Sequence, residues 1–366
     1  MQLFELFPSR DGHGAGQDLS VKAQEGVSSS GKASLAVERS SPQVYDSTAS
    51  MEHDQLCTMC SLIKFDPQAD PPWAGFESYK DRHALGTFGD VSRRKRCPLC
   101  RLVCHVLGNS RDASVHQEPY EVYLERHEIG LNVRGCSFAV ISPVVDPSFR
   151  QAKYRWSFPI SQKRVDYNRL LYWIDCCIAK HEDCRVKEFR RPAHLGFGEI
   201  AKLRLIDVVE RRIVEVQMPT NYVALSYVWG GVPNFRLTTN NLPALSKPGA
   251  ITKIWHRLPR TIRDAIEVTE GLKERYLWVD SLCLIQNDRT DMKNGIVVMD
   301  LIYELANLTI IAASGSHADA GLPGVGCTSR PITQYIEHIQ PGLDLAVYFD
   351  IEHLLSQTAY NRRGWT

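Results

Sequence analysis

The chain has little of what would direct a protein to a membrane or to nucleic acid. It contains no apolar stretch near the ~20 residues that a helix needs to span a bilayer. Its amino-terminal segment lacks the apolar core of a secretory signal. The formal net charge is only +1, so we expect neither nucleic acid nor an acidic membrane as the main partner. These absences together predict a cytoplasmic protein without a membrane span.

Two common nucleotide-binding motifs are also missing. The sequence has neither the G-x-G-x-x-G pattern of dinucleotide-binding folds nor the G-x-x-x-x-G-K-[ST] pattern of P-loop enzymes. The sequence therefore supports neither a standard dinucleotide-binding fold nor a P-loop ATPase. The 11 cysteines stand in a chain without a secretory signal. We expect them to be thiols or metal ligands rather than a disulfide framework.

The most informative segment is the apolar run from Tyr222 to Tyr227, which leads into Trp229-Gly230-Gly231. Branched and aromatic residues without alternation are typical of a strand buried on both faces, as in a parallel sheet under helices. Glycines directly after the strand let the backbone turn sharply and approach a ligand closely. In open α/β sheets, ligands bind at the carboxyl ends of such strands.

Two further strands follow, each after a helical pattern. Leu258–Thr269 predicts one amphipathic helix, and residues 291–306 predict a second. Strands joined by helices in this way form a right-handed parallel arrangement. We therefore predict that strands near residues 223–227, 276–279 and 309–312 are parallel neighbours in one sheet.

An alternating pattern precedes the first of these strands. Residues 203–208 and 212–216 predict a hairpin that extends the sheet beside its first strand, in antiparallel orientation. Residues 166–181 predict an amphipathic helix. Cys177, His181 and Cys184 near its end have metal-ligand spacing, but no fourth ligand is evident nearby, so packing is the favoured interpretation.

The segment from Tyr222 to Thr366 resembles the fungal heterokaryon-incompatibility (HET) domain. The blocks that carry the resemblance are, in order, YVALSYVWGG, LPRTIRDAIEVT, RYLWVDSLCLIQND, IYELANLTIIAASG, GLPG and the closing RGWT. A single block could arise by chance, but the ordered set is highly specific. The family acts in nonself recognition, where the domain triggers programmed death of fused cells whose genotypes differ. The resemblance implies other incompatibility or signalling proteins as partners, and self-assembly as a further interaction.

The resemblance also implies a fold and a chemistry. HET domains are considered distantly similar to TIR domains, which are flavodoxin-like signalling modules, some of which cleave NAD. We therefore expect an α/β fold with a flavodoxin/TIR-like parallel sheet flanked by helices. NAD-cleaving TIR domains use a glutamate that follows a segment resembling Arg-Gly-Trp. Because the chain stops at Thr366, we expect a C-terminally truncated domain that is not an efficient NAD glycohydrolase.

Three predicted strand ends should converge into one site. They offer hydroxyls, backbone amides, a carboxylate and an indole, which suit the phosphates, ribose and ring of a nucleotide such as NAD. The nucleotide-binding candidates are Ser226, Tyr227, Trp229, Gly230, Asp280 and Ser314, and the catalytic candidates are Asp280 and Ser281. A purely non-catalytic interaction or assembly domain is the alternative, and it predicts exposed apolar patches without nucleotide binding.

Each of these residues also has a structural interpretation. In that interpretation the Ser226 hydroxyl bonds to the backbone and to no ligand, Trp229 fills the core, and Asp280 caps the segment that follows it. For Asp280 we favour function, since burying a carboxylate is costly, whereas Ser281 stays open. Cys283 raises a third class, a thiol hydrolase that needs an activating histidine, but its leucine neighbours favour an inert buried thiol.

The sequence before residue 201 divides into two parts. Residues 1–50 are polar, without periodicity, and are predicted to be disordered. Residues 51–200 are expected to form a mixed, mostly helical region that bears cysteines, and residues 201–366 the HET domain.

Two C-x2-C pairs stand in the cysteine-bearing region. Cys57 and Cys60 form one pair, and Cys97 and Cys100 form the other, with 36 residues between the pairs. Four thiolates from two such pairs suit tetrahedral zinc, and would then lie roughly 3.5–4 Å apart. However, the spacer is longer than in a usual zinc ribbon, and buried cysteines on a helix face also behave as small hydrophobes. Structural zinc and core packing both stay open, with packing slightly favoured.

Overall fold

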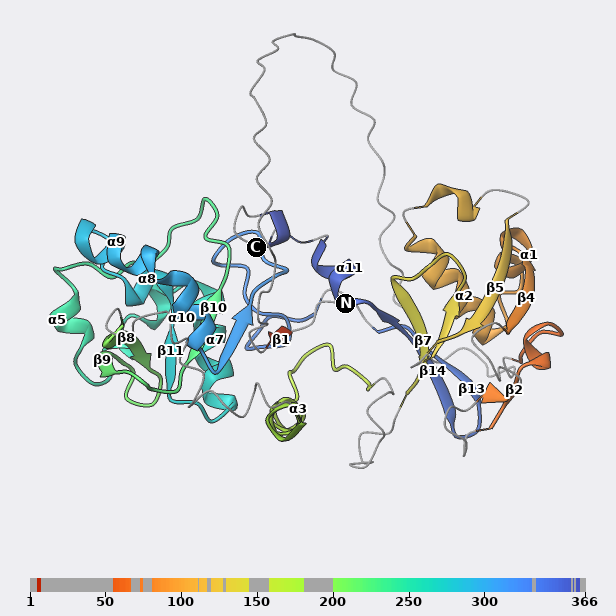
Figure 1. The fold of residues 1–366 in the computed structure, drawn as a ribbon, viewed down its shortest axis with the longest axis horizontal. Helices are drawn as coiled ribbons and strands as arrows, with labels where there is room; N and C mark the ends of the chain where they lie inside the picture. The colour runs from red at the N-terminus through yellow and green to blue at the C-terminus, as the bar shows by residue number, and fades with distance from the viewer. Residues whose placement is uncertain are drawn as a thin grey trace, which may run out of the picture. The chain divides into compact units, whose positions relative to one another are not determined.

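The computed structural model describes residues 5–7, 55–66, 73–74, 81–110, 112–116, 120–127, 130–144, 158–180, 200–330, 334–356, 358 and 360–362 (Figure 1). Within these residues the fold is mixed α/β, with two six-stranded sheets and one two-stranded sheet. The expected disordered tail contains a short strand, β1 (Glu5–Phe7), and the rest of that tail lies outside the described residues. His181, Cys184 and the closing RGWT also lie outside them.

The first sheet holds the predicted strands. Its order is β1, β12 (Leu308–Ile311), β10 (Val223–Ser226), β11 (Tyr276–Trp278), β8 (Lys202–Asp207) and β9 (Arg212–Gln217). Strand β10 pairs in parallel with both β11 and β12, so that Val223 lies opposite Leu277 on one side and Leu308 on the other. The prediction of three parallel neighbours is therefore confirmed.

Helices connect these three strands, and the longest of them buries an apolar stripe. Helix α7 (Arg260–Gly271) precedes β11 and buries Ile262, Ala265 and Ile266. Between β11 and β12 lie α8 (Asp280–Cys283), α9 (Arg289–Val297) and α10 (Met299–Leu305). The single helix predicted for residues 291–306 is wrong, since the backbone leaves helical geometry at Val298 (φ −107°, ψ 14°). Three successive β-branched residues end there, and such residues weaken a helix.

The outer strands correct the expected sheet type. Strands β8 and β9 form the predicted antiparallel hairpin, but β8 pairs with β11 rather than with β10. The predicted neighbour was wrong because β10 already has a partner on each edge. Strand β1 pairs with β12 in antiparallel orientation. The sheet as a whole is therefore mixed, with parallel pairing only among β11, β10 and β12, and the expected flavodoxin/TIR-like parallel sheet is not what the structure shows.

The second sheet is antiparallel throughout. Its order is β13 (Ile336–Gln340), β14 (Leu343–Phe349), β7 (Ala139–Pro143), β6 (Leu131–Val133), β5 (Glu121–Arg126) and β4 (Arg82–Thr87). Val122 and Leu124 of β5, with Leu131 and Val133 of β6, alternate with more exposed residues and are fully buried. This alternation explains why residues 121–143, within the region expected to be mixed and mostly helical, form strands of this sheet.

Two helices pack with the second sheet. Helix α1 (Phe88–Arg93) begins with a capping box, in which the Thr87 hydroxyl accepts from the Asp90 amide and the Asp90 carboxylate accepts from the Thr87 amide. Helix α2 (Pro98–Gly108) buries Leu99 and Val103 in the same core. Strands β13 and β14 come from residues 336–349, so this sheet combines segments from both sides of the boundary expected near residue 200.

The remaining elements are one helix of 14 residues, α3 (Tyr167–Lys180), and several short segments. The short segments are η1 (Cys60–Leu62), β2 (Lys64–Phe65), β3 (Trp73–Ala74), η2 (Ala113–His116), α5 (Leu242–Leu245), α6 (Ala250–Lys253), η3 (Trp255–Arg257), α11 (Ile351–Ser356) and η4 (Tyr360–Arg362). Helix α3 confirms the helix predicted for residues 166–181. Across the described parts of the chain, every helix is too short or too polar to cross a membrane.

Candidate functional site

The ends of β10 and β11 meet through two side-chain hydrogen bonds. The Trp229 indole Nε1 donates to Asp280 Oδ2 at 2.9 Å, and the Tyr227 hydroxyl donates to Ser281 Oγ at 3.0 Å. The loop after one parallel strand is thus tied to the first turn of the helix after the next. Four of the residues that the sequence placed in a nucleotide or catalytic site therefore lie together.

Asp280 is the central group of this network. Besides the indole, its carboxylate accepts the Ser281 amide on Oδ1 at 2.6 Å. Its backbone carbonyl accepts from Gln286 Nε2 at 3.0 Å. Both carboxylate oxygens therefore have donors from the protein itself. The guanidinium of exposed Arg236 lies over the Trp229 ring, 5.1 Å from its centroid.

Behind Asp280 lies a buried hydroxyl pair. Ser281 is fully buried, and Tyr227 is almost so. Asn234 Nδ2 donates to the Tyr227 hydroxyl at 3.1 Å, which completes the chain of bonds. Burial, with the Asp280 carboxylate nearby, raises the pKa of Tyr227 well above its usual value. Tyr227 therefore stays protonated at neutral pH, and Ser281 has no path to a ligand in solvent.

Gly230 has the close approach that its position after a strand suggested. Its φ is +64°, and a Cβ there would meet His317 Cβ at 2.5 Å. The neighbouring Trp229 carbonyl accepts the Ala318 amide at 3.0 Å. The glycine thus lets the loop after β10 lie against the loop after β12, which is a protein contact rather than a ligand contact.

Two further serines of the predicted site, Ser226 and Ser314, lie at or just after the ends of β10 and β12. The Ser226 carbonyl accepts the Ala312 amide at 2.8 Å, which continues the β10–β12 pairing. Ser314 follows β12 and is partly buried. Nucleotide contacts by these two residues stay a prediction.

Cys283 is a buried, inert thiol. It is 1% exposed, and its sulfur accepts the Val279 amide at 3.3 Å. Burial raises the pKa of Cys283 to about 12, so the thiolate that a hydrolase needs is scarce at neutral pH. The structure supports the inert-thiol interpretation.

Sequence reasoning missed Asp264, which anchors the GLPG turn. Asp264 is 4% exposed, and its Oδ2 accepts the Leu322 amide at 2.7 Å. The neighbouring Thr261 hydroxyl accepts the Gly321 amide at 3.1 Å. Burial raises the pKa of Asp264 to about 6. The signal that could have revealed it is a carboxylate on the apolar face of the predicted helix.

A cavity of about 550 Å³ lies elsewhere, along α9. It is lined by Gln286, Asn287, Arg289, Met292, Lys293, Ile296 and Val297. Ile296 and Val297 are 51% and 69% exposed. None of the predicted nucleotide-binding residues lines this cavity.

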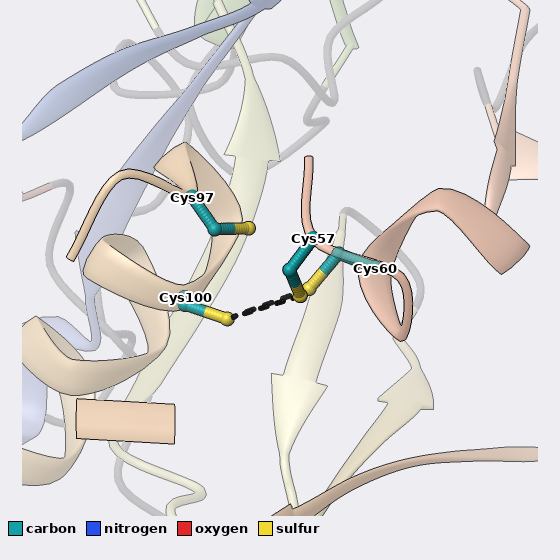
Figure 2. Close-up of side chains that lie close together, drawn as sticks. All are labelled: Cys57, Cys60, Cys97 and Cys100. Atoms are coloured by element: carbon teal, nitrogen blue, oxygen red, sulfur yellow. Dashed lines mark hydrogen bonds between the residues drawn. The ribbon is translucent and has the colours of Figure 1, made fainter. Parts of the chain in front are cut away.

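The four cysteines of the two C-x2-C pairs form a second cluster, shown in Figure 2. Cys57 and Cys60 come from η1 and the turn before it, whereas Cys97 and Cys100 come from the first turn of α2. All four sulfurs lie within 4.8 Å of one another. The Sγ of Cys100 is 3.8 Å from that of Cys57 and 3.6 Å from that of Cys60. The sequence interpretation that favoured simple packing did not anticipate this convergence.

The surroundings of the cluster favour negative charge on one sulfur, that of Cys97. The Cys97 sulfur receives hydrogen bonds from the thiols of Cys100 and Cys60 and from backbone amides, which lower the pKa of Cys97. Hydrogen bonds to Cys100 and Cys97, with burial, raise the pKa of Cys60. For Cys100, the hydrogen bond with Cys60 lowers the pKa, but Cys97 and burial outweigh it and the pKa is raised. The helix N-terminus at Pro98 adds its positive dipole end.

Comparison with known proteins gives one finding. Residues 222–366, less than half of the chain, match the family model described as "Heterokaryon incompatibility protein (HET)". This match supports a HET domain in that part of the chain. No curated protein and no solved structure matches the chain.

Proposed function

We propose that this chain is a nonself-recognition and cell-death signalling module of a heterokaryon-incompatibility system, with the HET domain of residues 222–366 as its effector part. The family match over those residues is the observation that carries the proposal. The family suggests a role in heterokaryon incompatibility. Recognition, death signalling, a fungal cell and a cytoplasmic location are the finer parts of this proposal.

We further propose that the domain acts by binding other incompatibility proteins rather than by cleaving NAD. The Asp280 carboxylate already accepts from the Trp229 indole and the Ser281 amide. A ligand at that carboxylate would have to share it with these two donors. The network is therefore better suited to fixing two strand ends than to catalysis. NAD cleavage at Asp280, by analogy with TIR domains, is the alternative.

Induced expression in a filamentous fungus tests both statements. The wild-type chain should raise the uptake of a vital dye, while cellular NAD stays constant until the cells lose integrity. Asp280→Asn should weaken death in proportion to its loss of folded protein, because it removes one hydrogen bond of the network. Asp300→Asn, at an exposed position of α10, serves as the matched control.

Two outcomes would contradict the proposal. An early fall in NAD that Asp280→Asn abolishes without lowering the amount of folded protein would make the domain an NAD-cleaving enzyme. Continued growth of cells that contain folded wild-type chain, alone and after fusion with strains of different genotype, would remove the death-signalling role.

A further inference from the structure

We infer that Cys57, Cys60, Cys97 and Cys100 form a tetrathiolate site for Zn²⁺, which holds the segment around η1 against α2. In a tetrahedral site with Zn–S bonds of about 2.3 Å, neighbouring sulfurs lie about 3.8 Å apart. The measured separations of 3.8 Å and 3.6 Å match this value. Four cysteines, with no oxygen or nitrogen ligand among them, select a soft ion such as zinc.

The backbone around each pair is already organised. The Ser61 amide donates to the Cys57 carbonyl at 2.8 Å, and the Ile63 amide to the Cys60 carbonyl at 3.1 Å, which closes the turn of the first pair. The Met59 carbonyl contacts His83 Nε2 at 2.6 Å, so that β4 fixes the same turn. The second pair is fixed by the helical turn between Cys97 and Cys100. Binding a metal here would require little reorganisation.

Charge balance also fits a tetrathiolate. Four thiolates and one Zn²⁺ carry two net negative charges, which are costly to bury without donors or a cation. Arg94 hydrogen-bonds Cys100 and lies near Cys57 and Cys60. Its Nη1 is held by the Leu85 carbonyl at 2.6 Å. Backbone amides of Cys57 and Cys100 donate to the Cys97 sulfur, as outer-shell donors do around metal thiolates.

Neither rival explanation accounts for four convergent sulfurs. A disulfide needs sulfurs about 2.05 Å apart, and the sulfurs of Cys57 and Cys60 are each more than 3.5 Å from that of Cys100. Packing alone gives no reason for four sulfurs to gather at one point, and Cys136, which is buried in the same core, lies outside the cluster.

The site would act through α2 on a strand of the family-matched segment. Arg101 of α2 makes two hydrogen bonds to the Glu337 carboxylate on β13, at 2.7 Å and 2.5 Å. His105, one helical turn on, stacks on Tyr335 with ring centroids 4.4 Å apart. Fixing the first turn of α2 by zinc should therefore stabilise the pairing of α2 with β13.

Metal analysis of the full chain, purified under reducing conditions, tests the site. We expect about one zinc per chain. Cobalt replacement should give sulfur-to-cobalt charge-transfer absorption and the intense visible bands of a tetrahedral ion. Cys60→Ser should lower bound zinc at least about tenfold, whereas Cys136→Ser should keep it. Cys57→His, a ligand exchange, should keep the metal and shift the visible cobalt bands.

Hydrogen exchange tests the consequence for the fold. Removal of zinc by a chelator should speed amide exchange in residues 98–108 and 336–340, and added Zn²⁺ should reverse the change. Residues 223–226 of β10 serve as the internal control and should not respond. Folded wild-type chain that binds neither zinc nor cobalt while its four thiols are reduced would overturn the site, whatever the variants do. Bound zinc with unchanged exchange in 98–108 would overturn its role on α2.

Discussion

Replacing Asp264 by Asn should make the protein more stable at neutral pH and should remove a pH dependence. The Asp264 carboxylate is 4% exposed, beside Glu267 and Arg260. Burial is the largest cause that raises its pKa from 3.8 to about 6. At about 1.4 kcal/mol per pKa unit, this difference corresponds to roughly 3 kcal/mol.

The sign follows from the raised pKa. The folded protein holds the Asp264 proton more tightly than the unfolded chain does, so its contribution to stability is fully present below pH 3.8. That contribution is lost as pH rises through the folded value near 6. Ionised Asp264 therefore lowers stability at pH 7.5. Asn keeps an oxygen that can accept the Leu322 amide, but it carries no charge.

Urea unfolding at several pH values between 4 and 8 measures this effect. Asp264→Asn should raise the free energy of unfolding at pH 7.5 by about 1–3 kcal/mol and change it little at pH 4. Asp264→Ala should instead destabilise by about 1–3 kcal/mol at pH 4, since it leaves the Leu322 amide without its acceptor, and should destabilise less at pH 7.5, where loss of the buried charge offsets that cost. A constant difference between wild type and Asp264→Asn across the pH range would refute the reasoning. Asp300→Asn is the exposed control.

Three further predictions concern the loop after β10 and the thiols. Gly230→Ala should destabilise by about 2 kcal/mol or more, from its positive φ and the contact with His317, whereas Gly231→Ala, with nothing within 4 Å, should change unfolding little. Trp229→Phe should cost about 1–3 kcal/mol by removing the donor to Asp280; an equal loss in the half-exposed control Trp173→Phe would count against the bond. Iodoacetamide should label exposed Cys327 in the native protein and buried Cys283 only after denaturation, as peptide mass spectrometry would show; rapid native labelling of Cys283 would contradict its raised pKa.

The central sheet was accessible from sequence because its signals are local. Strand β10 is apolar on both faces, and each connection to its neighbours contains a helical pattern, so parallel order followed from short segments. The position of the β8–β9 hairpin could not be predicted from short segments, because it depends on contacts between residues that are distant in the sequence. Asp207, whose side chain is 1% exposed, pairs with Arg275 just before β11 at 2.8 Å. No sequence pattern within residues 202–217 predicts that Asp207 pairs with Arg275.

The second sheet shows the same limit more strongly. Strand β14 pairs with β13 and with β7, and the residues of β7 that it pairs with lie more than 200 positions earlier in the chain. The apolar pattern of residues 343–349 predicts a strand, but it does not say which sheet the strand joins. The cysteine cluster was undecided for a related reason. The spacing within each pair is local, whereas the convergence of the pairs depends on how 36 intervening residues fold.

The strand-end site illustrates a different limit, since the residues were found but their role was not. The residue types that can bind a nucleotide can also hydrogen-bond to one another: an indole donor, a carboxylate and two hydroxyls. Trp229 and Tyr227 satisfy Asp280 and Ser281 at 2.9 Å and 3.0 Å. Four polar side chains at adjacent strand ends thus identify a junction that the fold must fix. Whether such a junction also binds a ligand depends on which of its hydrogen bonds a ligand can share or replace, and here each oxygen of Asp280 already accepts one, from the Trp229 indole and from the Ser281 amide.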